Sequence, residues 1–146
     1  MAAGFQGSLT AKQNIQFVCR IYNKNNTETR KIIDFVEDFA EIGKFFHMPI
    51  KTYSSGMKSR VNFGLSMAFD FNYYLVDEVT AVGDPSFKLK AKKEFNKKRE
   101  QSNIIMVSHD IPHLKENVDI GIYLNNGEIT IYDDINEAIE LYKTNI

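Results

Sequence analysis

The chain has 146 residues, of which 43% are hydrophobic and 25% are charged, and this composition predicts a folded, soluble protein rather than a disordered one. Eighteen Lys and Arg residues nearly cancel nineteen Asp and Glu residues, and the net charge of -1 argues against a basic nucleic-acid binder. The single cysteine, Cys19, excludes an internal disulfide and fits a reducing compartment. No apolar run reaches the roughly 18 residues of a membrane span, and no signal peptide is recognisable, so we expect an intracellular, single-domain chain.

Hydrophobic periodicity predicts three helices in the first half of the chain, over residues 10–22, 29–42 and 55–68. Thr10 has the residue type and the position of an N-cap for the first helix. Gly43 follows the second helix and is expected to end it, because glycine often terminates helices.

The second half of the sequence predicts strands that alternate with helices. Residues 71–76 and 104–107 are short and almost wholly apolar, which is typical of buried parallel strands. A predicted helix over 86–99 lies between them, so the three segments form a βαβ unit. A further helix is expected over 111–117.

Apolar and polar residues alternate over 119–132, around the turn sequence Asn125–Gly127, which predicts a β-hairpin. Its apolar residues are expected on shared faces: Ile120, Ile122 and Leu124 before the turn, and Ile129 and Ile131 after it. A last helix is expected to start at Asp133 or Asp134, where Asp134 and Glu137 have the spacing of a capping box.

Ionisable residues follow both predicted parallel strands. The first strand ends in Asp77-Glu78, and His109 comes shortly after the second. Because parallel strands present their carboxyl ends at one edge of a sheet, we expect these three side chains to converge. Apolar residues followed by Asp form the Walker B pattern, in which the carboxylate holds Mg²⁺, a neighbouring Glu polarises water and a His contacts the γ-phosphate. The alternative is that the acidic pair simply begins a loop.

The segment Tyr53–Met57 opens the third predicted helix with serines and a glycine. Free N–H groups, the helix dipole, the hydroxyls of Ser54 and Ser55, and close approach at Gly56 together suit an anion. The alternative is an ordinary serine N-cap. Further along this helix, the small residue Gly64 predicts close packing.

Four motifs in this order resemble the nucleotide-binding domain of ABC transporters. Tyr53–Met57 is similar to the signature motif of that family, and Tyr74–Glu78 to Walker B followed by the catalytic carboxylate. Ala81–Asp84 is similar to the D-loop, which brings Asp84 into the expected nucleotide site, and His109 to the switch histidine. The resemblance implies an α/β, partial P-loop NTPase (ABC-type) fold with a helical subdomain, a parallel sheet core and a C-terminal β-hairpin.

The resemblance covers the chain from about Gly4 to Lys143 and points to one branch of the family. The forms YSSGM and DEVTAVGD are similar to the exporters of capsular and other bacterial cell-surface polysaccharides. Most members have a Pro where Val79 stands, and two glycines and a Gln in place of Ser55-Gly56-Met57. Gln6 is the candidate for the Q-loop glutamine, although in other members that residue lies further ahead of the helix.

The Walker A motif GxxxxGK[ST] does not occur in this sequence. We therefore expect residues 1–146 to form a partial, N-terminally truncated ABC ATPase domain, with a helical subdomain over about 10–70 and the Walker B to C-terminal part over about 71–146. In the family, the Walker A strand lies beside the strand that ends in His109. The resemblance thus implies an unpaired, apolar edge on the strand 104–107, which would favour aggregation of the isolated chain.

The resemblance implies the ATP-binding subunit of a bacterial polysaccharide exporter, with ATP and Mg²⁺ as cofactors. Its implied partners are a second ATPase subunit, arranged head to tail, and an integral membrane permease, at the inner face of the bacterial inner membrane; no nucleic acid is implied. Without Walker A, the chain alone is expected to be inactive.

Two other functions can be weighed against the residues. The first is an interaction module, or a non-functional gene product, that keeps the fold without catalysis. The second is a phosphoacceptor receiver domain, which would need an early acidic pair and a late Lys after a strand, and the sequence has neither.

Overall fold

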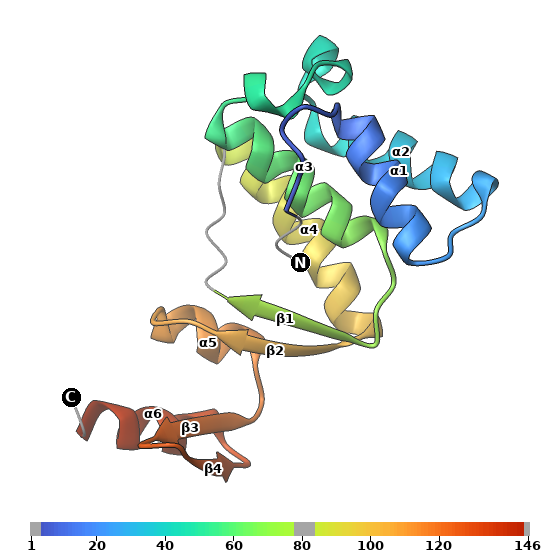
Figure 1. Cartoon of the computed structure of the whole chain (residues 1–146). Helices are drawn as coiled ribbons and strands as arrows, with labels where there is room; N and C mark the ends of the chain where they lie inside the picture. The colour runs from blue at the N-terminus through green and yellow to red at the C-terminus, as the bar shows by residue number, and fades with distance from the viewer. Residues whose placement is uncertain (1–3, 78–83, 145–146) are drawn as a thin grey trace. The chain divides into compact units, whose positions relative to one another are not determined.

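The computed structural model describes residues 4–77 and 84–144 (Figure 1). The elements follow one another in the order α1 (Ala11–Ile21), α2 (Asn26–Ala40), η1 (Gly43–His47), η2 (Ile50–Thr52), α3 (Ser55–Ala68), β1 (Tyr73–Asp77), α4 (Pro85–Gln101), β2 (Asn103–Val107), α5 (Ile111–Asn117), β3 (Gly121–Asn125), β4 (Glu128–Tyr132) and α6 (Ile135–Thr144). Within these described ranges, no helix combines the length and apolar character that a membrane crossing requires.

The chain divides into two units that are interleaved in the sequence. The helical unit comprises Met1–Asn72 and Ala81–Ser102, and the strand unit comprises Tyr73–Thr80 and Asn103–Ile146. Helix α4 therefore belongs to the helical unit, although it lies between two strands of the other unit in the sequence.

Side-chain caps fix where the first helices begin. Thr10 caps α1 as predicted, and its hydroxyl and the Gln13 side chain complete a capping box. Asn25 and Glu28 form a second capping box, so α2 begins at Asn26, three residues before the predicted start. The prediction that Gly43 ends this helix is wrong, because the chain leaves the helix at Glu41, which adopts a left-handed conformation with φ 51°.

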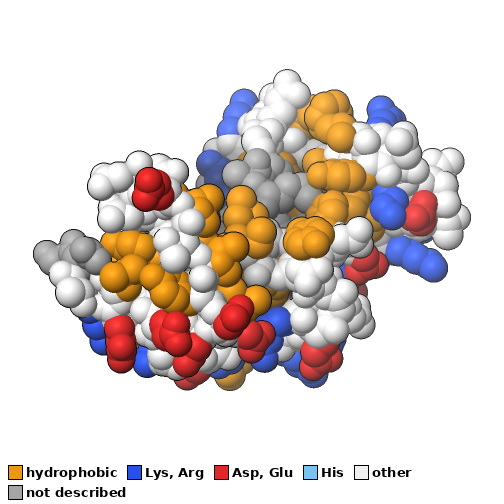
Figure 2. Space-filling model, turned by 90° about the horizontal axis from the view of Figure 1, so that it is seen from below, with side chains coloured by type: hydrophobic (Ala, Val, Ile, Leu, Met, Phe, Trp, Pro, Cys, Tyr) orange, Lys and Arg blue, Asp and Glu red, His pale blue; other side chains and the backbone are white. Residues whose placement is uncertain are grey.

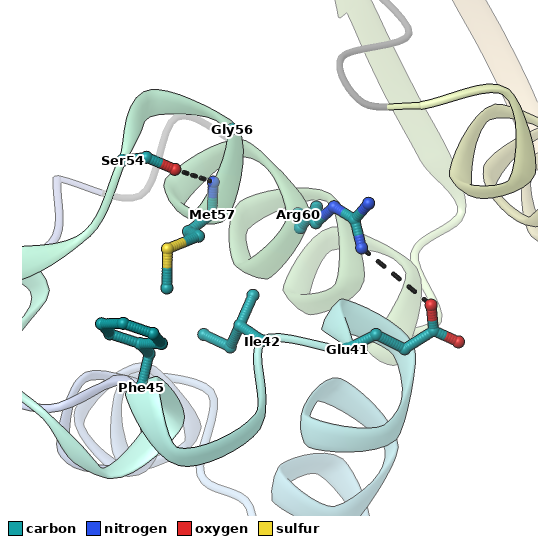
Figure 3. Close-up of a pocket in the computed structure, with 7 residues that line it drawn as sticks. All are labelled: Glu41, Ile42, Phe45, Ser54, Gly56, Met57 and Arg60. Atoms are coloured by element: carbon teal, nitrogen blue, oxygen red, sulfur yellow. Dashed lines mark hydrogen bonds and ion pairs between the residues drawn. The ribbon is translucent and has the colours of Figure 1, made fainter.

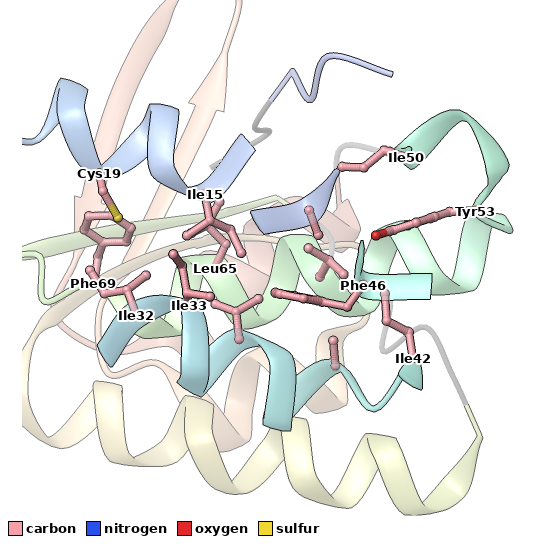
Figure 4. Close-up of a cluster of buried hydrophobic side chains, with 14 residues drawn as sticks. Ile15, Cys19, Ile32, Ile33, Ile42, Phe46, Ile50, Tyr53, Leu65 and Phe69 are labelled. Carbon is pink, nitrogen blue, oxygen red and sulfur yellow. The ribbon is translucent and has the colours of Figure 1, made fainter. Parts of the chain in front are cut away.

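The core of the helical unit lies between α1, α2 and α3, where apolar side chains point toward one another (Figure 4). Its members include Ile15 and Cys19 from α1, Val36 from α2, and Leu65 from α3. It is formed by fourteen buried residues: Ala11, Ile15, Cys19, Ile32, Ile33, Val36, Ala40, Ile42, Phe46, Ile50, Tyr53, Val61, Leu65 and Phe69.

Gly64 brings α2 and α3 close together, as the sequence predicts. It is buried, and a Cβ added to it would lie 3.0 Å from Phe39 Cδ1 and 3.5 Å from Val36 Cγ1. The Phe39 ring is 3% exposed and lies in a second, smaller cluster with Phe87 and Ala91 of α4.

Strands β1 and β2 pair in parallel, as predicted, with Leu75 opposite Ile105 and Asp77 opposite Val107. Among the described strands, each is hydrogen-bonded only to the other, which confirms the predicted open edge of β2. The prediction of buried strands is wrong: Tyr74 alone is buried in this sheet, and Leu75 is 70% exposed. Two strands form too narrow a sheet to cover their own faces, which explains the exposure.

Strands β3 and β4 form the predicted hairpin, in which Ile122 lies opposite Ile131 and Leu124 opposite Ile129. Its turn places Asn126 and Gly127 at positive φ, 47° and 84°, as a tight hairpin turn requires.

Helix α6 packs against the hairpin on the face opposite to the exposed side chains of Ile122 and Ile131. A Cβ on Gly121 would lie only 2.4 Å from Ala138 Cβ, so glycine is required there. The predicted capping box at its start is not observed, because the Asp134 carboxylate accepts a hydrogen bond from Asn136 N at 2.8 Å, while Glu137 N donates to the Asp134 carbonyl.

Candidate functional site

The serine-rich segment forms the first turn of α3. The Ser54 hydroxyl accepts a hydrogen bond from Met57 N at 3.2 Å, so Ser54 is an N-cap, and Ser54 and Ser55 are both exposed. The N–H groups of Ser55 and Gly56 have no acceptor within the helix, since the first turn leaves such groups unpaired. The Ser54 hydroxyl also keeps its own hydrogen for donation. This turn therefore offers several donors to an acceptor that approaches from solvent.

A pocket of about 470 Å³ lies beside this turn (Figure 3). Its apolar wall comes from Ile42, Phe45 and Met57, whose side chains point toward one another in the figure. The rest of its lining is polar or small: Glu41, Ser54, Gly56 and Arg60. The pocket thus joins the start of α3 to the segment that follows α2.

Two cations cap the C-terminal end of α2. The Arg60 guanidinium, from α3, donates to the Ala40 carbonyl at 3.3 Å, and Lys90 Nζ, from α4, donates to the Asp38 and Phe39 carbonyls at 2.9 and 3.1 Å. Positive charge at this position also complements the negative end of the helix dipole. Lys90 further pairs with Glu41 at 2.7 Å. The end of α2 is thereby tied to α3 and α4.

Arg60 also connects α3 to the start of α4. Its guanidinium forms an ion pair with the Asp84 carboxylate and lies 4.4 Å from the centre of the Phe87 ring. Neither the role of Arg60 nor its pairing with Asp84 was predicted, since no local pattern reveals a partner 24 positions away. Arg60 thus lines the same pocket as Ser54 and Gly56 and also pairs with Asp84.

Asp84 is the N-cap of α4. Its carboxylate accepts hydrogen bonds from the Ser86 hydroxyl at 2.7 Å and from the backbone N–H groups of Ser86 and Phe87, each at 3.0 Å. These hydrogen bonds, with Arg60 nearby, lower the pKa of Asp84 to about 2. The carboxylate is therefore ionised throughout the physiological pH range.

Asp77 and His109 both lie at the carboxyl end of the β1–β2 sheet. Asp77 is the last residue of β1 and is aligned with Val107, and His109 follows Val107 by two positions. Both side chains are exposed. Glu78 lies outside the described residues. Within residues 4–77 and 84–144, no group of three or more His, Cys, Asp and Glu side chains could hold a metal ion.

Gln6 lies in the segment before α1, where its side chain is exposed. Its backbone is held by Asn14, which accepts from Gln6 N at 2.8 Å and donates to Gln6 O at 3.2 Å. Asn14 is the buried polar residue that fixes this segment, with 4% of its surface exposed. The Gln6 side chain is thus presented to solvent by a well-anchored backbone.

The chain is similar to named ATP-binding proteins along its whole length, although no protein-family model matches it. The polysialic acid transport ATP-binding protein KpsT of Escherichia coli is 56% identical over 147 residues, which cover 100% of this chain and 67% of KpsT. The capsule polysaccharide export ATP-binding protein CtrD of Neisseria meningitidis serogroup B is 42% identical, over 98% of this chain and 65% of CtrD. The chain therefore spans about two thirds of the length of these relatives.

Solved structures show the same fold. The ATP-binding subunit of an ABC transporter superposes with a TM-score of 0.78 at 15% identity, over 95% of this chain and 58% of that one. A dimeric ATP-binding cassette bound to ADP and Pi superposes with a TM-score of 0.67 at 22% identity, over 92% of this chain and 61% of that one. These matches confirm the predicted ABC-type α/β fold, and the chain belongs to the family of ABC transporter ATP-binding proteins, in the branch named for the export of capsule polysaccharide.

Proposed function

We propose that this chain is part of the ATP-binding subunit of a bacterial exporter of capsular or related cell-surface polysaccharide. The observation that carries the proposal is the 56% identity to KpsT over the whole chain. The ATP-binding protein BexA of Haemophilus influenzae supports it, at 40% identity over 97% of this chain and 64% of BexA.

The first turn of α3 is the proposed signature contact to nucleotide, through Ser54, Ser55 and Gly56. Support comes from the space around Gly56, where an added Cβ would meet only Ser54 Oγ, at 3.9 Å. The fold therefore leaves a side chain room at this position. Glycine instead keeps the helix N-terminus open to an anion such as a phosphate, which unpaired N–H groups and the helix dipole attract.

The carboxyl end of the β1–β2 sheet is the proposed catalytic edge. Asp77 suits Mg²⁺, because this ion is bound in proteins by one or two carboxylates together with phosphate oxygens. When bound, MgATP supplies the phosphoryl group and a cation that neutralises its charge. We assign Glu78 to orienting and polarising water, and His109 to contacting the γ-phosphate.

Asp84 and Gln6 are proposed to complete the nucleotide site. Asp84 is an ionised N-cap held by Arg60, so the start of α4 is anchored to α3. The exposed Gln6 side chain is available to the ligand. The proposed partners are a second ATP-binding subunit, arranged head to tail, and a membrane permease, at the inner face of the bacterial inner membrane. A solved relative of this fold is a dimeric cassette, which supports the first of these partners.

The chain alone is proposed to lack ATPase activity, because its sequence contains no Walker A motif. The same observation favours a second candidate function, an interaction module that keeps the fold without catalysis. The test compares MgATP binding and hydrolysis by the chain alone with those of the chain joined to an N-terminal segment that carries Walker A.

We expect hydrolysis only with the added segment, and its loss in the Glu78→Gln variant. Glu128→Gln changes an exposed carboxylate on β4 outside the proposed site and serves as the control. Hydrolysis by the chain alone that disappears in Glu78→Gln contradicts the proposed inactivity. No binding or hydrolysis even with the added segment favours the interaction module.

A further inference from the structure

Helix α4 carries more positive charge than the acidic residues around it neutralise. Its segment 88–99 contains seven Lys and Arg residues and a single acid, Glu94. Three of these lysines form ion pairs with carboxylates: Lys90 with Glu41, Lys97 with Glu94, and Lys98 with Asp70. Three others, Lys88, Lys92 and Lys93, are exposed, and among residues 4–77 and 84–144 no Asp or Glu pairs with them. The charge of this second group is therefore open to solvent.

The three exposed lysines share one surface of α4 with Leu89. Lys88 and Lys92 are four positions apart on the helix. Leu89 and Lys93 have the same spacing, so all four side chains are neighbours, and we call this group the lysine patch. Leu89 is 71% exposed. The opposite side of the helix is held in the helical unit by the buried Phe87, so the lysine patch faces solvent.

The charges near the lysine patch do not neutralise it. The N-cap carboxylate of Asp84 lies one turn before Lys88, but it is already paired with Arg60. Glu100 is exposed on the same side of α4 as Lys93, two turns further along, or about 10 Å along the helix axis. This separation is about one Debye length at 0.1 M salt, so Glu100 weakens the field of the patch little. By contrast, acidic and basic side chains lie close together on the face that Figure 2 shows.

The composition of the lysine patch favours a membrane surface over a soluble polyanion. Lysines attract the anionic headgroups of a lipid bilayer, and each lysine near such a surface strengthens binding by a factor of about five. The exposed Leu89 gains from contact with the apolar part of a bilayer, whereas a hydrated acidic glycan offers it no apolar contact. The patch also contains no aromatic residue on which nucleic-acid bases could stack.

We propose that the lysine patch is a contact surface for an anionic phospholipid bilayer, with the three ammonium groups at the headgroups and Leu89 directed into the interface. Three lysines together strengthen binding by a factor of roughly 100, so the contact is weak and reversible and adds to any other attachment of the protein to a membrane. Lipid contact of this kind needs neither nucleotide nor permease, so it does not rest on the proposed function.

Flotation of the full chain with lipid vesicles tests the proposal, because bound chain rises with the lipid and aggregated chain sinks. The vesicles contain equal parts of phosphatidylcholine and phosphatidylglycerol. Vesicles of phosphatidylcholine alone report binding through other exposed apolar side chains. We expect roughly a hundredfold stronger binding to the anionic vesicles at low salt. This difference should disappear at about 1 M salt, which screens charges beyond about 3 Å.

Substitutions by Gln locate the contact, since Gln and Lys have similar helix propensities. Lys92→Gln combined with Lys93→Gln should weaken binding to anionic vesicles about 25-fold. The matched control, Lys12→Gln combined with Lys51→Gln, removes two exposed lysines from α1 and η2 of the same unit and should change binding by less than about twofold. Leu89→Gln should weaken vesicle binding about threefold and leave binding to heparin, a soluble polyanion, unchanged.

Circular dichroism of each variant, with binding normalised to folded chain, separates lost lipid contact from lost folding. The proposal is overturned if anionic and neutral vesicles bind equally. It is also overturned if the control pair weakens binding as much as the Lys92 and Lys93 pair, because the attraction is then not specific to the patch. Heparin binding that depends on Lys92 and Lys93, together with no effect of Leu89→Gln on vesicles, would identify a soluble polyanion as the ligand instead.

Discussion

The same substitution at two glycines of α3 should have opposite effects on stability. In Gly56→Ala, the new Cβ meets only Ser54 Oγ, at 3.9 Å, so the variant gains helix propensity without a clash. We expect its free energy of unfolding to stay unchanged or to rise by up to about 1 kcal/mol. In Gly64→Ala, the Cβ lies 3.0 Å from Phe39 Cδ1, and the same gain is opposed by an overpacking cost of about 1–3 kcal/mol.

The surroundings of Phe39 indicate an overpacking cost of about 2 kcal/mol, within that range. Its ring is stacked on Phe35 and on Phe63, with centroids 5.8 Å apart in both pairs, and meets Phe87 edge-on at 5.3 Å. The ring therefore has little room to move away from a new methyl group. We expect Gly64→Ala to be less stable than Gly56→Ala by about 2 kcal/mol.

Thermal unfolding followed by circular dichroism measures the difference, which corresponds to roughly 8 °C in Tm for a chain of this length. In the chain joined to a Walker A segment, Gly56→Ala should lower ATP turnover per folded molecule, because its methyl group lies where phosphate is expected. Gly64→Ala should retain turnover per folded molecule. If Gly56→Ala is as destabilising as Gly64→Ala, the glycine at 56 is structural and the reasoning fails; unchanged turnover would remove its proposed role in ligand approach.

Three further predictions concern Asp84, Gly121 and Cys19. The pKa of Asp84 is lowered from 3.8 to about 2, so its ionised form stabilises the fold fully above pH 3.8 and loses this effect as the pH falls toward 2. The urea midpoint of the unchanged chain should therefore fall across that pH interval, and Asp84→Asn should make this fall less steep. An unchanged slope in the variant contradicts the prediction. Gly121→Ala should destabilise the hairpin by about 1–3 kcal/mol in urea unfolding, and adding Ala138→Gly should recover part of the loss, since the two Cβ atoms would otherwise lie 2.4 Å apart. Cys19 is buried, and burial raises the pKa of its thiol. At neutral pH it should therefore react with a thiol reagent only as fast as the helical unit opens. Labelling at the rate of a free thiol would contradict the position of Cys19 in the core.

Local sequence patterns predict where the helices of this chain lie, but they do not predict what surrounds its strands. The cap at Thr10 and the start of α3 are set by neighbouring residues, and both are found as predicted. The early start of α2 also had a local signal, the Asn25 and Glu28 spacing, which the surrounding polar run obscured. The exposure of Leu75 had no local signal in the sequence, because an apolar run shows that a strand prefers burial but does not show what covers it.

The motifs of the candidate site could be predicted from the sequence, but the contacts between residues far apart in the chain could not. Ser54 caps α3 and Asp77 ends β1, as their positions relative to apolar runs imply. Arg60 was missed, because its contacts with the Ala40 carbonyl and with Asp84 join residues 20 and 24 positions away. Such contacts depend on how three helices pack, and one-dimensional spacing does not encode that packing.

The interleaving of the two units has a consequence for synthesis on the ribosome. Strand β1 emerges before α4, whose Lys90 and Phe87 complete the end of α2 and the Phe39 cluster. From Tyr73 to Asn103 the ribosome adds thirty residues, so the apolar β1 waits for its partner strand for roughly 2–6 s at ordinary elongation rates. The helical unit ends at Ser102, whereas the strand unit extends to Ile146, so the strand unit finishes folding after the helical unit. A pause in translation within α4 would therefore prolong the time during which the nascent chain exposes an unpaired strand to chaperones and to other nascent chains.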